Sequence, residues 1–283
     1  MDPVAPESPR SSIVRVVRPP SGLALPNLRE LWHSTDLVYL LAKRDVTIRY
    51  RQTAVGILWA VLQPLLLSAI FTVFLGRLAN VPSGETPYAL FALTGMTLWL
   101  VLASGISSIS ESTVASSELI SKVYFPRIVV PVAALIPPIV DFAVSFAVLI
   151  GVLLVAGETL QPQILLAPVV FAVGATFALG IGLWLSAIVV RYRDVTLMIP
   201  FLILVLMFTS PILYPLSLVP DDYQTLYSLN PLVGVLEAFR WTVLPDAPAP
   251  GLLVLVPAVA GITLVITGLL YFTRAERRFA DVI

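Results

Sequence analysis

The sequence predicts an all-α membrane protein with six transmembrane helices, and two observations support this fold class. The chain of 283 residues is 58% hydrophobic and only 12% charged, which is more apolar than a soluble domain. Its apolar stretches also reach the roughly 20 helical residues that cross a bilayer core about 30 Å thick. Strands of a membrane barrel are about 10 residues long and alternate strictly, so these longer, continuous stretches favour helices.

Six stretches are expected to cross the membrane. They are residues 54–76, 87–110, 128–156, 164–190, 195–220 and 251–273. Among them, only the third contains a charged residue, Asp141. An ionisable side chain at membrane depth is costly and often functional. Two roles stay open for Asp141: helix packing through bonds to hydroxyl or amide groups, or a part in a transport pathway or gate.

The fourth of these stretches carries a row of small residues. Gly174, Ala178 and Gly182 recur four positions apart, so they lie on one face of a helix. Such a row lets another helix approach closely. We expect that partner to be a helix of the same chain rather than a second copy.

The distribution of Lys and Arg predicts the side of the membrane on which each loop lies. Fifteen of the 17 Lys and Arg residues fall in four segments, residues 1–53, 111–127, 191–194 and 274–283. Cytosolic loops of membrane proteins carry such an excess. We therefore expect a cytoplasmic (inner) membrane protein with both termini in the cytosol. Residues 1–27 are rich in proline and are predicted to be a mobile tail, and residues 274–283 a cytosolic C-terminus.

The segment before the first span, residues 28–53, is expected to form an amphipathic interface helix on the cytosolic surface. Its leucines suit one helix face, and its end carries a basic cluster that anionic head groups attract. The cluster consists of Lys43, Arg44, Arg49 and Arg51. Residues 46–51 alternate in polarity like a strand, whereas the adjoining span favours a helix, so the sequence alone leaves their local shape open.

The cytosolic segment 111–127 is longer than a simple connection. It has 17 residues, whereas a turn needs about 4–6. Residues 117–125 are amphipathic and end at Pro126, which predicts a short helix. Such a helix is suited to sit in a groove of a soluble partner and to pass motion into the membrane helices; the alternative is a solvated turn.

The outer segment 221–250 is unusually apolar for a loop. Its hydrophobic residues keep a rough helical period, so we expect short re-entrant helices over residues 223–244 that pack on the bundle. Glu237 and Arg240 are spaced to pair on one helix face. The Asp221-Asp222 pair fits a Pro-Asp-Asp turn better than the metal site of a membrane glycosyltransferase.

Several kinds of chemistry are excluded by composition. The chain has no Cys and a single His, His33, which argues against thiolate or His-based metal sites and against Cys or His-dependent nucleophiles. It contains no Gly-Lys pair, so it carries no P-loop for ATP. The net charge is zero, which gives no sign of a nucleic-acid partner. We expect no catalytic residue, no metal and no cofactor on this chain, and a transport function rather than an enzymatic one.

Three motifs, in the same order along the chain, resemble the ABC-2-type exporter permeases. The first runs from Arg44-Asp45 through Arg49-Tyr50-Arg51-Gln52-Thr53 and Gly56 to Trp59 and Gln63-Pro64. The second is the run from Leu119 to Arg127, and the third comprises Asn230-Pro231-Leu232, Glu237 and Phe239-Arg240. The resemblance is to the polysaccharide branch of these permeases, which exports O-antigen, capsule, teichoic acid or galactan.

The resemblance implies a homodimer in which each copy binds a separate cytosolic ATPase subunit, which carries ATP and Mg. It implies a coupling helix at 117–125, with contact residues Leu119, Ile120, Lys122, Tyr124, Phe125 and Arg127. It implies a cytosolic collar formed by Arg44, Arg49 and Arg51, where a lipid-linked polysaccharide arrives. It also implies outer gate helices at 223–244 that include Asn230, Glu237 and Arg240, and it favours a helix for residues 46–51.

Aromatic side chains within the spans suggest a path for sugars. Aromatic faces stack on the apolar faces of sugar rings, although Trp and Tyr also collect at membrane interfaces for ordinary reasons. We predict that the path includes Trp59, Phe71, Phe74 and Phe142.

The preferred function is therefore the membrane subunit of an ATP-driven exporter of lipid-linked polysaccharide. The alternative is an ABC-2 exporter of a drug, a peptide or a lipid. A secondary transporter or a polytopic membrane glycosyltransferase is disfavoured, because the spans hold few charged groups for ion coupling or sugar chemistry.

Overall fold

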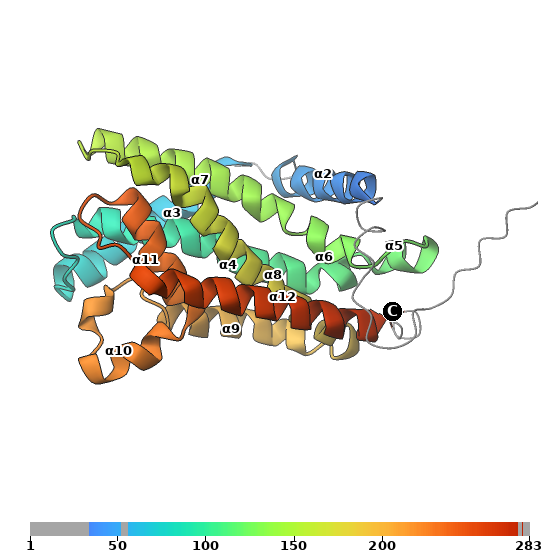
Figure 1. The fold of residues 1–283 in the computed structure, drawn as a ribbon. Coiled ribbons are helices and arrows are strands. Elements are labelled where there is room, and N and C mark those ends of the chain that lie inside the picture. Colours follow the sequence, from blue (N-terminus) through green and yellow to red (C-terminus); the bar gives the residue numbers. More distant parts are fainter. Residues whose placement is uncertain (1–33, 52–55, 277–278, 280–283) are drawn as a thin grey trace, which may run out of the picture.

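Long helices run side by side through most of the molecule (Figure 1). The structure is a computed structural model that describes residues 34–51, 56–276 and 279. Within these ranges the only β-pairing is one isolated bridge between Ser83 and Glu85, so the all-α prediction is confirmed. The predicted tail at residues 1–27 lies outside the described residues.

Five helical stretches in the described ranges are long and apolar enough to cross a membrane. The first consists of α3 (Leu58–Phe71) and a π-helix, η1 (Thr72–Leu78), and the second is α4 (Tyr88–Ala115). The third combines α6 (Val129–Ala133) with α7 (Ile136–Val155). The last two are η2 (Pro162–Leu166) with α8 (Ala167–Arg191), and η4 (Gly251–Val254) with α12 (Leu255–Glu276).

The fifth predicted span, residues 195–220, is not one continuous helix. Its helix α9 (Val195–Phe208) has 14 residues, about 21 Å at 1.5 Å per residue, which is shorter than a bilayer core. Pro211 and Pro215 follow, and proline cannot donate the backbone bond that continues a helix. The chain therefore leaves the helix after Phe208 and forms only the short η3 (Leu216–Leu218) before the outer segment.

The short helices outside the spans differ slightly from the predicted bounds. Residues 46–51 are helical, within α2 (Thr35–Arg51), because a helix pairs its own backbone groups where no neighbouring strand is available. The predicted coupling helix 117–125 is shorter, α5 (Ser117–Lys122), since Val123 is extended. The outer segment forms α10 (Asp221–Ser228) and α11 (Pro231–Val243), so Asp221 and Asp222 lie in the first turn of a helix rather than in a free turn.

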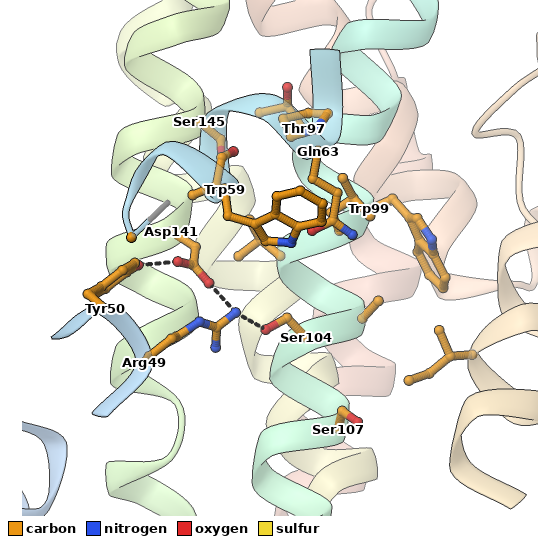
Figure 2. Close-up of a pocket in the computed structure, with 17 residues that line it drawn as sticks. Arg49, Tyr50, Trp59, Gln63, Thr97, Trp99, Ser104, Ser107, Asp141 and Ser145 are labelled. Carbon is orange, nitrogen blue, oxygen red and sulfur yellow. Dashed lines mark hydrogen bonds and ion pairs between the residues drawn. The ribbon is translucent and has the colours of Figure 1, made fainter. Parts of the chain in front are cut away.

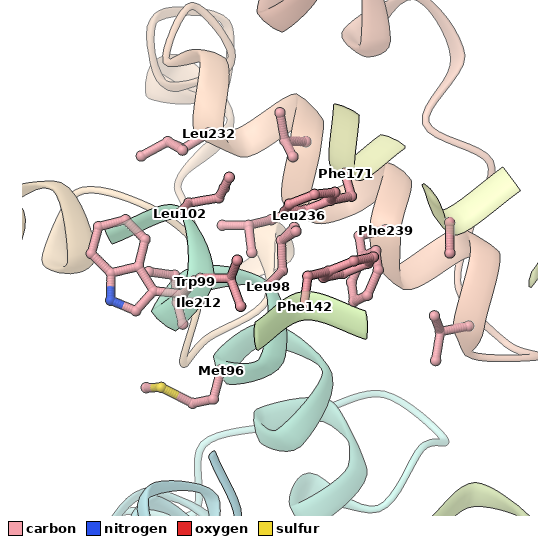
Figure 3. Packing of buried hydrophobic residues seen from close by; sticks show 14 of the residues in the cluster. Met96, Leu98, Trp99, Leu102, Phe142, Phe171, Ile212, Leu232, Leu236 and Phe239 are labelled. Atoms are coloured by element: carbon pink, nitrogen blue, oxygen red, sulfur yellow. The ribbon is translucent and has the colours of Figure 1, made fainter. Parts of the chain in front are cut away.

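Helix α4 forms the centre of the bundle and packs against α7, α8 and α11. Of its most apolar 18 residues, 78% are buried. The core that surrounds it is built from large apolar side chains (Figure 3), among them Leu98, Leu102, Phe142, Phe171, Leu236 and Phe239. The row of small residues on α8 permits this packing, because a Cβ at Gly182 would lie 2.5 Å from Ile109 of α4. The predicted packing of this row within the chain is therefore confirmed.

Helices α2 and α3 are attached much more loosely. Of the most apolar 18 residues in Leu58–Leu78, only 11% are buried. In α2 only Leu41 and Ala42 are buried. The N-terminal helices thus lie against the bundle rather than inside it, and the candidate site lies between them and α4.

Candidate functional site

A cavity of about 630 Å³ lies between α2, α3, α4, α7 and α9. Figure 2 shows the Trp59 ring and the Gln63 amide, both from α3, over the cavity between α7 and α4. Hydroxyl and charged groups supply the rest of the polar part of the wall: Arg49, Tyr50, Thr97, Ser104, Ser107, Asp141 and Ser145. An apolar wall with a few convergent polar groups is typical of a ligand site.

Thr97 faces the cavity from the middle of α4. Its side chain is 1% exposed, and its hydroxyl has no hydrogen-bond partner among the described residues. Buried polar atoms are normally hydrogen-bonded. Water or a polar ligand group can bond to this hydroxyl only where neighbouring side chains move aside, since it is buried.

An ion-pair network crosses the cavity near the residues that end α2. The Arg49 guanidinium lies 2.5 Å from the Asp141 carboxylate of α7 and donates to the Ser104 hydroxyl of α4 at 2.9 Å. The Tyr50 hydroxyl donates to the same carboxylate. Burial, and then the hydrogen bond to Asp141, raise the pKa of the Tyr50 phenol, so it stays protonated and keeps donating. The predicted bonding of Asp141 to a hydroxyl group is thus confirmed, with an Arg partner that the sequence did not reveal.

A second polar contact joins α7 to α3. Pro64 lacks a backbone N–H, so the Ala60 carbonyl four residues earlier loses its usual helical donor. The Ser145 hydroxyl donates to this carbonyl at 3.0 Å. The proline in the middle of α3 therefore creates an acceptor that α7 satisfies.

Chain geometry at the start of α3 depends on a glycine. Gly56 has a φ of 53°, in the left-handed region that side chains with a Cβ rarely adopt. This turn precedes α3 and directs Trp59 toward the cavity. Gly56 itself is one of the residues that line it.

The segment after α4, which is predicted to be cytosolic, packs on α2. Ile120 and Phe125 share an apolar cluster with Leu41 and Ala42 of α2 and with Val129, Val130 and Ala133 of α6. Tyr124 is 83% exposed. Movement of this segment therefore reaches α2 directly through apolar contact.

Arg127 ties the same segment to the end of α12. Its guanidinium donates to the Glu276 carbonyl at 2.5 Å and lies 5.9 Å from the Phe279 ring. Spacing along the chain could not reveal these two partners, which lie about 150 positions away.

Polar side chains anchor the outer helix α11. Arg240 is 2% exposed, pairs with Glu237 at 2.9 Å and donates to the Ile212 carbonyl at 2.9 Å. The predicted Glu237–Arg240 pair is confirmed. The Asn230 side chain accepts from Leu232 N–H at the start of the helix, which caps it, and donates to the Thr209 carbonyl at 2.8 Å. These bonds hold α11 against the end of α9.

Comparison with known proteins decides the family. Residues 36–244 match the model of the ABC-2 type transporter family. The chain belongs to this family. The resemblance carried by its three motifs is therefore confirmed.

Three relatives of this ABC-2 chain have stated functions. It is 27% identical over 253 residues to the O-antigen export system permease protein RfbA of Klebsiella pneumoniae, which covers 88% of this chain and 95% of that protein. It is 27% identical over 219 residues to the protein of the same name from Myxococcus xanthus, with 75% and 82% covered. It is also 27% identical over 248 residues to the polysialic acid transport protein KpsM of Escherichia coli, with 84% and 93% covered.

The four aromatic residues predicted for the sugar path do not gather at one place in the ABC-2 chain. Trp59 lines the cavity and is 55% exposed. Phe142 lies in the core, stacked on Phe171 with ring centroids 3.9 Å apart. Phe71 packs partly buried against the core, and Phe74 is exposed on η1. Their part in a path remains a prediction, with Trp59 the one that lines this cavity.

The three collar arginines also differ in their surroundings. Arg44 pairs with Asp45 at 2.9 Å and donates to Ser116 at 3.4 Å. Arg49 reaches into the cavity, and Arg51 is exposed. A polar groove that includes Arg44, Ser108 and Glu111 lies beside Arg49 along α2 and α4.

Sequence reasoning missed the polar wall that α4 gives to the cavity. Thr97, Ser104 and Ser107 are spaced by seven and three residues, which places them on one helical face. This polar row within an apolar helix was the available signal. Among the described residues no group of three or more acidic, His or Cys side chains is placed to hold a metal.

Proposed function

We propose that this chain is the permease subunit of an ATP-driven exporter that moves a lipid-linked polysaccharide across the cytoplasmic membrane. The observation that carries this proposal is the chemistry of the cavity. One tryptophan face lies beside hydroxyl and amide groups, and an arginine lies at one end. Sugar rings stack on aromatic faces and bond to hydroxyls and amides, while an anionic carrier group suits arginine. Relatives named as an O-antigen export permease and as a polysialic acid transport protein support the same cargo class.

In this proposal two copies of the chain form the pore. Helices α3 and α9 expose large apolar side chains to the outside of the chain, among them Leu66, Ile70, Phe201 and Leu204. In a membrane such faces meet lipid or a second copy. Helix α9 with the residues up to 220 makes the fifth crossing, which returns the chain to the outer side. The fifteen Lys and Arg residues of the inner segments keep both termini in the cytosol.

Energy comes from ATP and Mg bound to a separate cytosolic ATPase subunit. The exposed side chains of the coupling segment, Lys122 and Tyr124, are suited to contact that subunit. Motion then passes through Ile120 and Phe125 to α2, with which they share an apolar cluster. The chain itself does no covalent chemistry; it supplies a path and, at α10 and α11, an outer gate.

Deleting the gene tests the proposed cargo. We expect polysaccharide to disappear from the cell surface and a lipid-linked polymer to accumulate on the cytosolic side of the membrane. The wild-type gene should restore export. Normal surface polysaccharide in the deletion strain would overturn the proposal and would favour a drug, a peptide or a lipid as cargo.

A pair of exposed tyrosines tests the coupling segment. Tyr124 lies in it, whereas Tyr192 lies in another predicted cytosolic segment and is 53% exposed. Tyr124→Ala should leave the amount of membrane protein unchanged and reduce export per ATP hydrolysed, and Tyr192→Ala should change neither. Equal export by both variants would remove Tyr124 from the coupling surface.

A further inference from the structure

Two polar side chains of α7 hold the loosely packed N-terminal helices. Asp141 binds Arg49 and Tyr50 of α2, and Ser145 donates to the Ala60 carbonyl of α3. The two residues are four apart and so share one face of α7. Both line the cavity. The α2–α3 pair is therefore fixed to the bundle across the cavity by polar contacts on one helix face.

The Arg49 side chain spans this cavity from one wall to another. It is bonded to Asp141 on α7 and to Ser104 on α4 (Figure 2). Thr97 lies seven residues from Ser104 along α4, about 10 Å farther along the helix at 1.5 Å per residue. Since α4 runs from the outer side to the cytosol in the proposed topology, Arg49 lies between the cytosol and Thr97.

Helix α2, which carries Arg49, also contacts the coupling segment. Leu41 and Ala42 of α2 contact the cluster that contains Ile120 and Phe125. Arg49 lies eight residues from Leu41, about 12 Å along the helix. A displacement of the coupling segment therefore acts on α2 at one point, and Asp141 resists it at the other.

We propose that Asp141 is a positioning residue that holds Arg49 and Tyr50 across the cytosolic end of the cavity, so that α2 acts as a latch. The proposal rests on the proposed function, because it assigns the latch to the entry of the cargo path. Movement of the coupling segment pulls α2 away, Arg49 leaves Asp141, and the cavity opens to the cytosol. Elements that move are held by few buried apolar contacts, which describes α2 and α3 but not α4.

The ion pair suits a latch better than apolar packing would. Asp141 is 6% exposed, and a buried carboxylate without its partner is strongly unfavourable. The pair therefore favours the closed position while leaving Arg49, whose side chain is 35% exposed, able to reach water or an incoming anionic group. An apolar side chain at position 49 would also hold the helices together, but it could not turn to water or to an anionic group when the latch opens.

Cysteine labelling of the full chain in complex with its ATPase tests the latch, because the sequence contains no native Cys. Thr97→Cys is nearly isosteric and places a thiol in the cavity wall, where the side chain is buried while Arg49 is paired. Thiol reagents are added from the cytosolic side of inverted membrane vesicles, in separate arms with a positively charged and a negatively charged methanethiosulfonate. Tyr192→Cys, which is 53% exposed in another predicted cytosolic segment, is the matched control.

We expect Asp141→Asn and Arg49→Gln each to raise the labelling rate of Thr97→Cys about tenfold, for both reagents. The double variant should label no faster than either single one, because both changes break the same pair. Opening raises the rate for both reagents, whereas a change in local charge alone raises one and lowers the other. In the chain with the intact pair, ATP should raise the rate, and labelling of Tyr192→Cys should stay constant in every variant.

Two results would overturn the latch. One is a labelling rate of Thr97→Cys that stays within about twofold of the starting value in Arg49→Gln. The other is opposite effects on the two reagents. If the Asp141→Asn protein fails to accumulate in the membrane, Arg49→Gln still tests the latch. Arg49 is partly exposed, so its replacement should disturb folding less. The labelling assay contains no cargo, so it does not depend on which molecule is exported. A failed latch would not change the conclusion of the gene deletion, and an unexpected cargo would not change the conclusion of the labelling.

Discussion

The central helices and the N-terminal pair are built in contrasting ways. Helix α4 is buried on nearly all sides by α7, α8 and α11, and its contacts are mostly apolar. Helices α2 and α3 expose most of their surface. A few apolar contacts, one ion pair and a few hydrogen bonds fix them to the rest of the bundle. The candidate cavity lies between these two parts, with one wall on each.

The difference separates stability from movement. In a closely packed apolar core, adding or removing even one methyl group lowers stability. The central helices therefore form a rigid frame. A few polar contacts can be broken and remade at smaller cost, so α2 and α3 can shift against that frame. We therefore expect substitutions in the central helices to lower stability, and substitutions in the N-terminal pair to change transport while the protein stays folded.

The largest contrast is expected between two aromatic residues. Phe142→Ala removes a ring that stacks on Phe171 in the core and should cost about 3–5 kcal/mol, seen as early loss of folded protein on heating in detergent. Trp59→Ala removes a ring that is 55% exposed and should leave this thermal transition nearly unchanged while export falls. Trp59→Phe keeps an aromatic face and should retain part of the export. Equal thermal losses for Phe142→Ala and Trp59→Ala would erase the contrast.

A smaller effect is expected from a methyl group between α8 and α12. A Cβ at Gly180 would lie 2.5 Å from the Leu264 Cβ and 2.9 Å from backbone atoms, so Gly180→Ala should force the helices apart at about 1–3 kcal/mol. The control is Gly151→Ala in α7, where nothing lies within 4 Å and alanine favours the helix. The same heating assay should show a loss for the first variant and none for the second.

The contact between Ser145 and Ala60 should give an effect of about 1–2 kcal/mol. Ser145→Ala leaves the Ala60 carbonyl without its donor. In Pro64→Ala the restored backbone N–H of residue 64 can bond to that carbonyl, so Ser145→Ala should cost clearly less in this background. A cost that is the same with and without Pro64 would show that the hydroxyl does not compensate for the proline.

Much of this contrast could be predicted from the sequence, but only where the signal is local. Apolar length located the helices, because it depends on residues close together in the chain. The distribution of Lys and Arg predicts their orientation in the same local way. The break after Phe208 was signalled by Pro211 and Pro215, yet the hydropathy of residues 195–220 concealed it. Phe142 lies in the core rather than on an open path, and the sequence could not show this. The face of α7 that meets α8 and α11 depends on how whole helices pack.

The polar network also escaped prediction for a physical reason. Arg49 and Asp141 lie 92 positions apart, and Ser145 supports a carbonyl that only the proline of another helix exposes. Such partners are fixed by tertiary packing rather than by spacing. The polar row of Thr97, Ser104 and Ser107 was the part of the cavity that helical periodicity could have revealed.

Photocrosslinking in growing cells tests most directly whether polysaccharide passes this cavity. A benzophenone amino acid at position 59 would stand where the Trp59 ring faces the cavity, and the same group at Val259, exposed on α12, would serve as the control. The account predicts that illumination yields a glycan-stained ladder on the chain from position 59 and none from position 259. Absence of the ladder at position 59 in cells that still export polysaccharide, or equal ladders at both positions, would contradict it.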